Sequence, residues 1–281
     1  MPAPRPLAIV KLGGSVLTRK GESERLRPKV LHRLAAEVAA LGDRPMVLLH
    51  GAGSFGHPGA SRFGLARPPA TSAEERARVR GASIVSAEVR RLHLAVLRAL
   101  VEAGGRPWSV PPSGIARQSE GRLVSLDPEP FRVALAGGWT PVSFGDVVPD
   151  AVWGSSILSA DTIATTLAVA LRPRRVIFVT DVPGIYRPGA PAPGRREIVR
   201  EISPEILASL STGTEGRDVT GGIRGKAAAM CAIAGAGVDA GLISGLSDGA
   251  LSRALEGAPV DGSWARAKPD ASERREGPAS A

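Results

Sequence analysis

Lys11-Leu12-Gly13-Gly14-Ser15 follows the apolar run 7–10, and His50-Gly51-Ala52-Gly53-Ser54-Phe55-Gly56-His57 follows the apolar run 46–49. Each stretch reads as a glycine-rich turn placed directly after a short buried strand. Glycine lets the backbone approach an anion closely and direct its N–H groups toward it. Two such turns, one carrying Lys11 and the other ending in His57, predict two phosphate groups held face to face, as phosphoryl transfer requires.

Strands and helices alternate along the chain, which predicts an α/β fold with a largely parallel sheet and crossover helices. The longest helix, 71–103, begins at a capping box of Thr71 and Glu74. The other expected helices are 28–42, 128–137, 159–171, 203–210, 223–236 and 247–256. The expected strands are 7–12, 45–50, 107–110, 122–125, 141–144, 175–179, 198–202 and 240–244.

The bulk composition fits an enzyme with a large core, because 43% of the 281 residues are hydrophobic. The apolar runs are of strand length, so we expect no membrane span and a cytoplasmic protein. The single Cys231 excludes an internal disulfide framework and a cysteine-cluster metal site. A net charge of +9 with only 4% aromatic residues favours a basic cleft for small phosphorylated ligands over nucleic-acid binding.

Three further segments carry candidate chemistry. The strand 175–179 runs into Thr180, Asp181, Gly184 and Tyr186, at the kind of strand end where ligands bind in open α/β sheets. The loop 218–226 opens a helix and ends in a lysine, a pattern typical of phosphate binding. Ser159-Ala160-Asp161 opens another helix, and Gly145 follows a strand.

Over about residues 7–256 these motifs resemble the amino acid kinase superfamily, whose members phosphorylate carboxylate, carbamate or phosphate groups from ATP. The resemblance rests on Lys-Leu-Gly-Gly-Ser with a second lysine at Lys20, on Gly-Ser-Phe-Gly-His closing on His57, and on Asp-Val-Thr-Gly-Gly-Ile-Arg-Gly-Lys ending in Lys226. It implies a three-layer α/β/α sandwich with a central, largely parallel sheet. Ala52 stands where a third glycine is common, and Ser159-Ala160-Asp161 where Ser-Gly-Asp is common.

The resemblance implies a role for each matched residue. Lys11, Lys20, His57 and Asp161 would be catalytic, with Asp161 orienting the lysines. Ala52, Gly53, His57 and Gly145 would hold the acceptor. ATP, bridged by Mg²⁺, would contact Lys11, Leu12, Gly13, Gly14, Ser15, Gly53, Thr180, Asp181, Gly184, Tyr186, Gly222 and Lys226. Other readings stay open: Lys20 as a solvated charge, Asp161 as a helix cap, and His57 as a cap of the following helix.

The histidine that closes the second loop is most similar to that of isopentenyl phosphate and fosfomycin kinases, which hold a phosphate or phosphonate there. The implied activity is ATP-dependent phosphorylation of isopentenyl phosphate. The alternatives are a fosfomycin-type or other alkyl phosphate kinase, and a nucleotide-binding protein without turnover. Ala60, Phe63, Ile84 and Val85 are candidates for an apolar acceptor wall.

The resemblance also predicts how the chain is organised. We expect one domain over 1–260, with an acceptor lobe over about 1–150 and an ATP lobe over about 151–260. The segment 261–281 is rich in Pro, Ser and charge, and we expect it to be a disordered tail. Related kinases commonly pair through a helix near the sheet edge, so the helix at 71–103 predicts a homodimer.

Overall fold

The computed structural model describes residues 5–19, 21–22, 24–187, 197–210 and 222–267. Its main sheet has the strand order β11-β10-β9-β1-β2-β6-β3, and all neighbours are parallel except β10 and β11. Residues of β1, β2 and β9 are buried throughout, as expected for strands covered on both faces. The strands are β1 (Ala8–Leu12), β2 (Met46–His50), β3 (Pro107–Ser109), β6 (Thr140–Phe144), β9 (Arg175–Thr180), β10 (Asp239–Ser244) and β11 (Gly262–Ala265).

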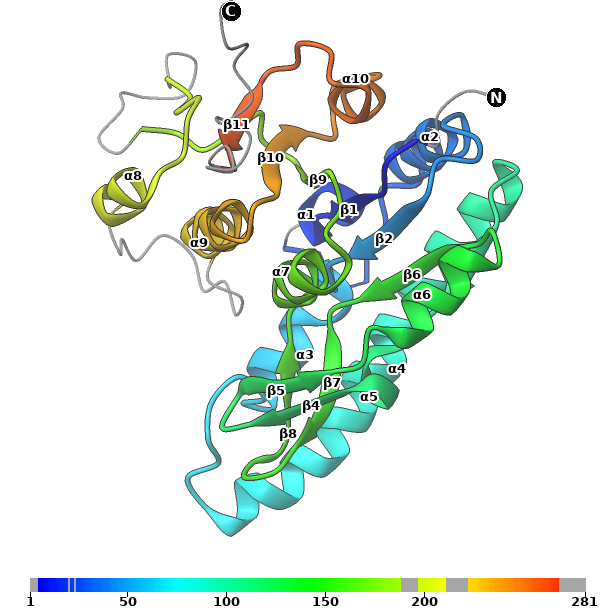
Figure 1. Cartoon of the computed structure of the whole chain (residues 1–281). Helices are drawn as coiled ribbons and strands as arrows, with labels where there is room; N and C mark the ends of the chain where they lie inside the picture. The colour runs from blue at the N-terminus through cyan, green and yellow to red at the C-terminus, as the bar shows by residue number, and fades with distance from the viewer. Residues whose placement is uncertain (1–4, 20, 23, 188–196, 211–221, 268–281) are drawn as a thin grey trace, which may run out of the picture.

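Helices cover both faces of this sheet (Figure 1). Strand residues such as Ile9 and Phe178 point to one core, while Val10 and Ile177 point to the other. The first core packs against α6 (Glu129–Ala136), α7 (Ala160–Leu171), α8 (Pro204–Ser209) and α9 (Gly222–Gly235). The second packs against α1 (Gly14–Leu17), α2 (Pro28–Ala39), α10 (Ala250–Glu256) and the second half of α4 (Ser72–Glu102). This arrangement confirms the expected three-layer α/β/α sandwich.

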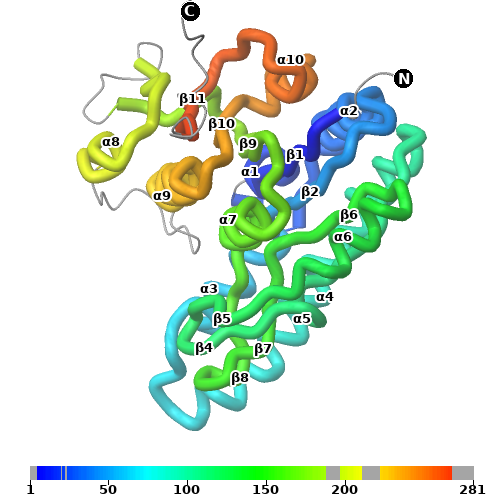
Figure 2. Tube along the Cα trace, viewed as in Figure 1, coloured from blue at the N-terminus to red at the C-terminus, as the bar shows by residue number. Residues whose placement is uncertain are grey.

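A second sheet, of strand order β5-β4-β7-β8, lies beside the first half of α4 (Figure 2). Its strands are β4 (Ala116–Ser119), β5 (Arg122–Leu126), β7 (Asp146–Asp150) and β8 (Gly154–Leu158). A third core, which includes Val85, Val89, Phe144 and Val147, lies between α4, α3 (His57–Arg62) and the strands β6 and β7. Two short helices, η1 (Gly53–Phe55) and α5 (Pro112–Ile115), complete this lobe. No helix in the described ranges is long and apolar enough to cross a membrane.

The structure corrects the sequence interpretation in three places. The expected strand 198–202 is wrong, because Ile198 and Glu201 form only isolated bridges, to Tyr186 and Trp264. Strand β11 lies inside the segment expected to be a tail, where it pairs antiparallel with β10; residues 268–281 are outside the described ranges. Strands β4, β7 and β8 were not anticipated, because their serines, charges and Pro149 break the alternation typical of a strand.

Arg78 ties the connection after α3 to the second sheet. The residue is 3% exposed, and its guanidinium donates to the carbonyl oxygens of Gly64, Leu65, Arg67 and Ser155 at 2.7–2.9 Å. These bonds satisfy a buried cation with backbone dipoles from two separate segments. A planar fork with five donors can make such a set of contacts, whereas a lysine cannot.

Asp150 joins the two hairpins of the second sheet. Its carboxylate accepts hydrogen bonds from the N–H groups of Glu120 and Gly121 in one hairpin, and of Val152 and Trp153 in the other. The Ser156 hydroxyl adds a further bond at 2.7 Å. Burial opposes ionisation of this carboxyl, but the bonds from these N–H groups and the hydroxyl outweigh it and lower its pKa to about 2.

We expect Asp150→Asn to lower the free energy of unfolding at pH 7 by roughly 2 kcal/mol, because bonds to a carboxylate are lost. A carboxyl whose pKa is lower in the folded state stabilises above its unfolded pKa of about 3.9, and this contribution disappears as the pH falls toward 2. The difference in the free energy of unfolding between wild type and variant should therefore shrink as the pH falls from about 4 to about 2, the interval between the unfolded and folded pKa values. Urea unfolding across pH 2–7 measures it. Asp127→Asn, which removes the charge from an exposed carboxylate that accepts the Glu129 N–H, is the control; an equal loss there contradicts the assignment.

Candidate active site

The carboxyl ends of the central parallel strands meet at one edge of the main sheet, and the turns that follow them are hydrogen-bonded to one another. Gly13 N donates to Val179 O at 2.7 Å, and Gly51 N donates to Leu12 O at 2.9 Å. Gly145 N donates to the carbonyl oxygen of His50 at 2.9 Å. The sheet therefore brings the predicted phosphoryl turn, acceptor turn and Gly145 to the same edge.

The two glycine turns touch backbone to backbone. A Cβ atom on Gly14 would lie 2.4 Å from the nitrogen of Gly53, and one on Gly51 would lie 2.8 Å from the nitrogen of Gly14. Gly53 has a φ of +52°, which favours glycine. The Thr18 hydroxyl donates to Gly14 O at 2.7 Å and accepts from Ser54 N at 3.0 Å. Glycine is thus required here by close approach as well as by turn conformation.

Both turns present backbone donors. Among the described residues, the N–H groups of Gly14, Ser15, Ala52 and Gly53 have no hydrogen-bond partner. Backbone N–H groups left without a partner are costly unless water or a ligand satisfies them. Consecutive N–H groups in turns of this kind form concave sites for anions. The turns therefore have the donors that two adjacent phosphates need.

Asp161 holds two lysines from distant parts of the chain. Lys11 on β1 places its Nζ 2.7 Å from one carboxylate oxygen, and Lys226 on α9 places its Nζ 3.3 Å from the other. Burial alone would raise the pKa of Asp161, but the charges of the two lysines outweigh it and hold the pKa below its usual value. The helix cap of α7 is Ser159, whose side chain accepts from Thr162 N, so Asp161 is not the capping residue. Three ionised groups leave a net positive charge, which suits a phosphate.

The residues expected to frame the nucleotide differ in what they contact. Asp181 accepts a hydrogen bond from the Ser15 hydroxyl at 2.6 Å, which links the end of β9 to the phosphoryl turn. Gly184 is instead packed: a Cβ there would lie 2.4 Å from the Ile198 side chain. Tyr186 forms a bridge to the same residue. Gly222 opens α9 with a φ of +54°, and Lys20 and the start of the loop 218–226 lie outside the described residues.

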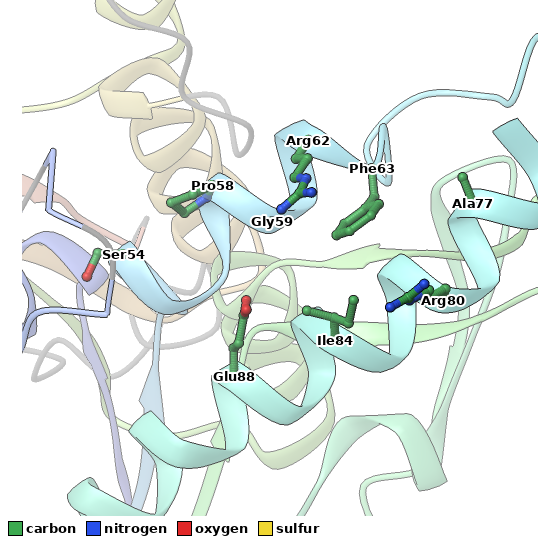
Figure 3. A pocket seen from close by; sticks show the side chains of 9 residues that line it. All are labelled: Ser54, Pro58, Gly59, Arg62, Phe63, Ala77, Arg80, Ile84 and Glu88. Atoms are coloured by element: carbon green, nitrogen blue, oxygen red, sulfur yellow. The ribbon is translucent and has the colours of Figure 1, made fainter.

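His57 begins α3 directly after the second glycine turn and is half-buried. A cavity of about 640 Å³ opens between α3 and α4, and its lining includes Pro58, the residue after His57 (Figure 3). Phe63 and Ile84 line this cavity as expected for an apolar wall, whereas Ala60 and Val85 lie in the third core. The full lining is Ser54, Pro58, Gly59, Arg62, Phe63, Ala77, Arg80, Ile84 and Glu88.

Sequence reasoning missed two residues of the site. Thr18, which joins the two glycine turns, carries no motif of its own and is found only from its contacts. His50 stands immediately before Gly51, at the carboxyl end of β2, and is fully buried. Its position beside a glycine turn was the available signal, but the partners that make it informative come from α4 and β3.

The profile of the amino acid kinase family matches residues 6–243. This chain belongs to the amino acid kinase family. It is 35% identical to the isopentenyl phosphate kinase of Methanothermobacter thermautotrophicus, over 91% of this chain and 97% of that protein. It is 34% identical to that of Thermoplasma acidophilum, over 80% of this chain and 85% of that protein. A solved isopentenyl phosphate kinase matches 92% of this chain and 99% of its own, with a TM-score of 0.80 and 31% identity.

In this amino acid kinase, we expect Gly14→Ala to lower kcat/KM about a hundredfold, because a methyl group must push the two turns apart and small misplacements cost that much. Gly114→Ala is the control, since a Cβ there meets nothing within 4 Å. Steady-state kinetics and thermal melting of both variants measure the effect. Similar kcat/KM values for the two variants would show that contact between the turns does not position the reacting groups.

Proposed function

We propose that this amino acid kinase transfers the γ-phosphoryl group of ATP to isopentenyl phosphate and so forms isopentenyl diphosphate. The observation that carries the proposal is His57, which ends the second glycine turn and is followed by Pro58, part of the lining of a cavity that also includes Phe63 and Ile84. The relatives that match almost the whole chain bear the name of this activity. A fosfomycin-type acceptor would leave the cavity behind His57 without a hydrocarbon to fill it.

The reaction needs positioning and charge neutralisation more than proton transfer. An oxygen of the acceptor phosphate forms a bond to the γ-phosphorus, and the bond from that phosphorus to the β–γ bridging oxygen breaks to release ADP. A phosphate monoester is largely ionised near pH 7, so no base is required. Asp161, held ionised by Lys11 and Lys226, therefore orients these lysines rather than accepting a proton.

The site residues take their proposed roles from these positions. Lys11 and the turn Gly13-Gly14-Ser15 contact the transferring phosphoryl group, and Lys20 adds charge from the loop after β1. His57 holds the acceptor phosphate with the N–H groups of Ala52 and Gly53, and Gly145 closes the acceptor site. Gly222 and Lys226 bind the nucleotide phosphates, while Thr180, Asp181 and Tyr186 frame the nucleotide. Gly184 supports that frame through its contact with Ile198.

Mg²⁺ enters as part of the nucleotide substrate. In the described part of the chain no three His, Cys, Asp or Glu side chains gather as a metal site, and Asp161 and Asp181 are each hydrogen-bonded or ion-paired to this chain. Magnesium commonly keeps phosphate and water oxygens as most of its ligands. The phosphate oxygens of ATP would therefore hold the ion, and its charge would add to that of the lysines.

Three further points belong to the same proposal. The first half of the chain supplies the acceptor lobe and the second half supplies the nucleotide lobe. The protein acts in the cytoplasm. It forms a homodimer through α4, which exposes Val79, Leu94 and Val101; light scattering tests the dimer, and a monomer would leave the catalytic assignment intact.

A coupled ADP-release assay with isopentenyl phosphate, geranyl phosphate and fosfomycin tests the activity. Isopentenyl phosphate should give a higher kcat/KM than fosfomycin, because each buried methylene of its tail contributes roughly 0.8 kcal/mol to binding. Geranyl phosphate measures how much longer a tail the cavity accepts. Fosfomycin as the best acceptor would replace the isoprenoid assignment by the phosphonate one. Binding of ATP without turnover of any acceptor would identify a nucleotide-binding protein.

We expect His57→Ala to raise the KM for isopentenyl phosphate about tenfold to a hundredfold, the cost of one lost charge-assisted bond. The KM for ATP should stay close to the wild-type value. His32→Ala is the control, because His32 is exposed on α2 and contacts only Glu102, at 3.5 Å, among the described ion pairs. If the variant instead loses ATP binding with a normal acceptor KM, the two turns are assigned in reverse.

We expect Ile84→Ala to shift the preference toward geranyl phosphate, because Ile84 lines the cavity next to Phe63. Removing its side chain lengthens the apolar space, so the ratio of kcat/KM for geranyl over isopentenyl phosphate should rise. Val79→Ala on the same helix is the control, since Val79 is 71% exposed. An unchanged ratio in Ile84→Ala would place the acceptor tail outside this cavity.

A further inference from the structure

Two buried histidines lie under the acceptor turn and have no place in the mechanism above. His50, at the end of β2, is 0% exposed, and His93, on α4, is 5% exposed. His50 Nε2 lies 3.0 Å from His93 Nδ1, and His93 Nε2 lies 2.8 Å from the Ser109 hydroxyl on β3. His50 Nδ1 lies 3.2 Å from the carbonyl oxygen of Gly51. The four ring nitrogens thus form one chain from the edge strand to the acceptor turn.

The end groups of this chain fix its direction. The Gly51 carbonyl can only accept, so His50 Nδ1 carries the hydrogen. A neutral imidazole has a single N–H, so His50 Nε2 accepts from His93 Nδ1, and His93 Nε2 accepts from Ser109. Burial lowers the pKa of His50 to about 4, with the charge of Lys11 adding to the effect, and burial, with His50 and Arg90 nearby, lowers the pKa of His93 to about 3. Both rings are therefore neutral at pH 7. Arg90, the charged residue near His93, is itself paired with Asp146, whose carboxylate lies 2.9 Å from the guanidinium.

The position of His50 is also fixed by packing. Its ring centroid lies 5.3 Å from that of His93 and 5.4 Å from that of Phe144, and the rings of His93 and Phe144 are themselves in contact, with centroids 4.2 Å apart. The His50 carbonyl oxygen accepts the N–H of Gly145. Burying two imidazoles costs more than burying apolar side chains unless every nitrogen is paired. The hydrogen bonds between His50, His93 and Ser109 therefore hold the His50 imidazole in place at the point where the turns of Gly51 and Gly145 begin.

We infer that His50 is a positioning residue for the acceptor phosphate: its hydrogen bond to the Gly51 carbonyl, maintained by His93 and Ser109, sets the direction of the Ala52 N–H. The C=O and N–H of a trans peptide point in opposite directions. Holding the Gly51 carbonyl toward the buried rings turns the Ala52 N–H away from them. That N–H has no partner among the described residues and is one of the donors assigned to the acceptor phosphate. The inference rests on the proposed function and adds residues to its acceptor site.

Two amides separate this role from a structural one. In His50→Asn the side-chain NH₂ occupies the place of Nδ1 and can still donate to Gly51, whereas in His50→Gln the amide reaches the place of Nε2 and retains only His93. We expect the KM for isopentenyl phosphate to stay within about twofold of wild type in His50→Asn and to rise about tenfold in His50→Gln, with the KM for ATP unchanged in both. Asparagine fills the space less well, so melting temperatures alone would rank the variants the other way.

Equal acceptor KM values in the two variants, or a parallel rise in the KM for ATP, would overturn the inference. If neither variant folds, Ser109→Ala decides, because Ser109 lies on the exposed edge strand and its loss removes only the donor at the far end. A raised KM for isopentenyl phosphate in Ser109→Ala supports the role of these hydrogen bonds, and an unchanged KM overturns the inference. A wild-type enzyme that does not use isopentenyl phosphate would overturn the proposed function, and this inference with it. An active wild type with indistinguishable His50 variants would overturn this inference alone.

Discussion

Contact between the backbones of Gly14 and Gly53 leaves no space for a side chain on either glycine, and the rest of the site is arranged around that contact. The parallel sheet creates it, because β1 and β2 are neighbours whose carboxyl ends lie level. Thr18 then bonds to both turns and keeps them together. The donor and acceptor phosphates that we propose for the two turns would consequently be neighbours before any side chain is considered.

Phosphoryl transfer requires positive charge close to the phosphates, and this fold brings two lysines together on the single carboxylate of Asp161. Lys11 and Lys226 lie more than two hundred positions apart in the sequence, yet both contact Asp161 at the start of α7. A buried cation without a partner would be costly, so the carboxylate allows both lysines to remain charged away from solvent. The positive charge left over among the three groups is the charge that the proposed function assigns to the phosphates of the substrates.

Local signals in the sequence were sufficient for the central strands, most helices and both glycine turns. Apolar runs of four residues mark β1, β2 and β9, and Thr71 marks the start of α4 by accepting from Glu74 N. Pairing partners decide the remainder: β7 and β8 are polar segments that become strands by pairing with each other. The same holds for the site, since the lysines and His57 stand in motifs, whereas His50 and Thr18 gain meaning only from residues on other elements.

The buried Arg78 fixes the connection between α3 and α4 in place. Its guanidinium binds carbonyl groups of the α3–α4 connection and of β8, so the segment that follows Phe63 is fastened to the second sheet. A lid that swings freely over the acceptor cannot be made from this connection without breaking several bonds to a buried cation. Under the proposed function, selectivity among acceptors of different length would therefore depend on the side chains that line the cavity, such as Phe63 and Ile84.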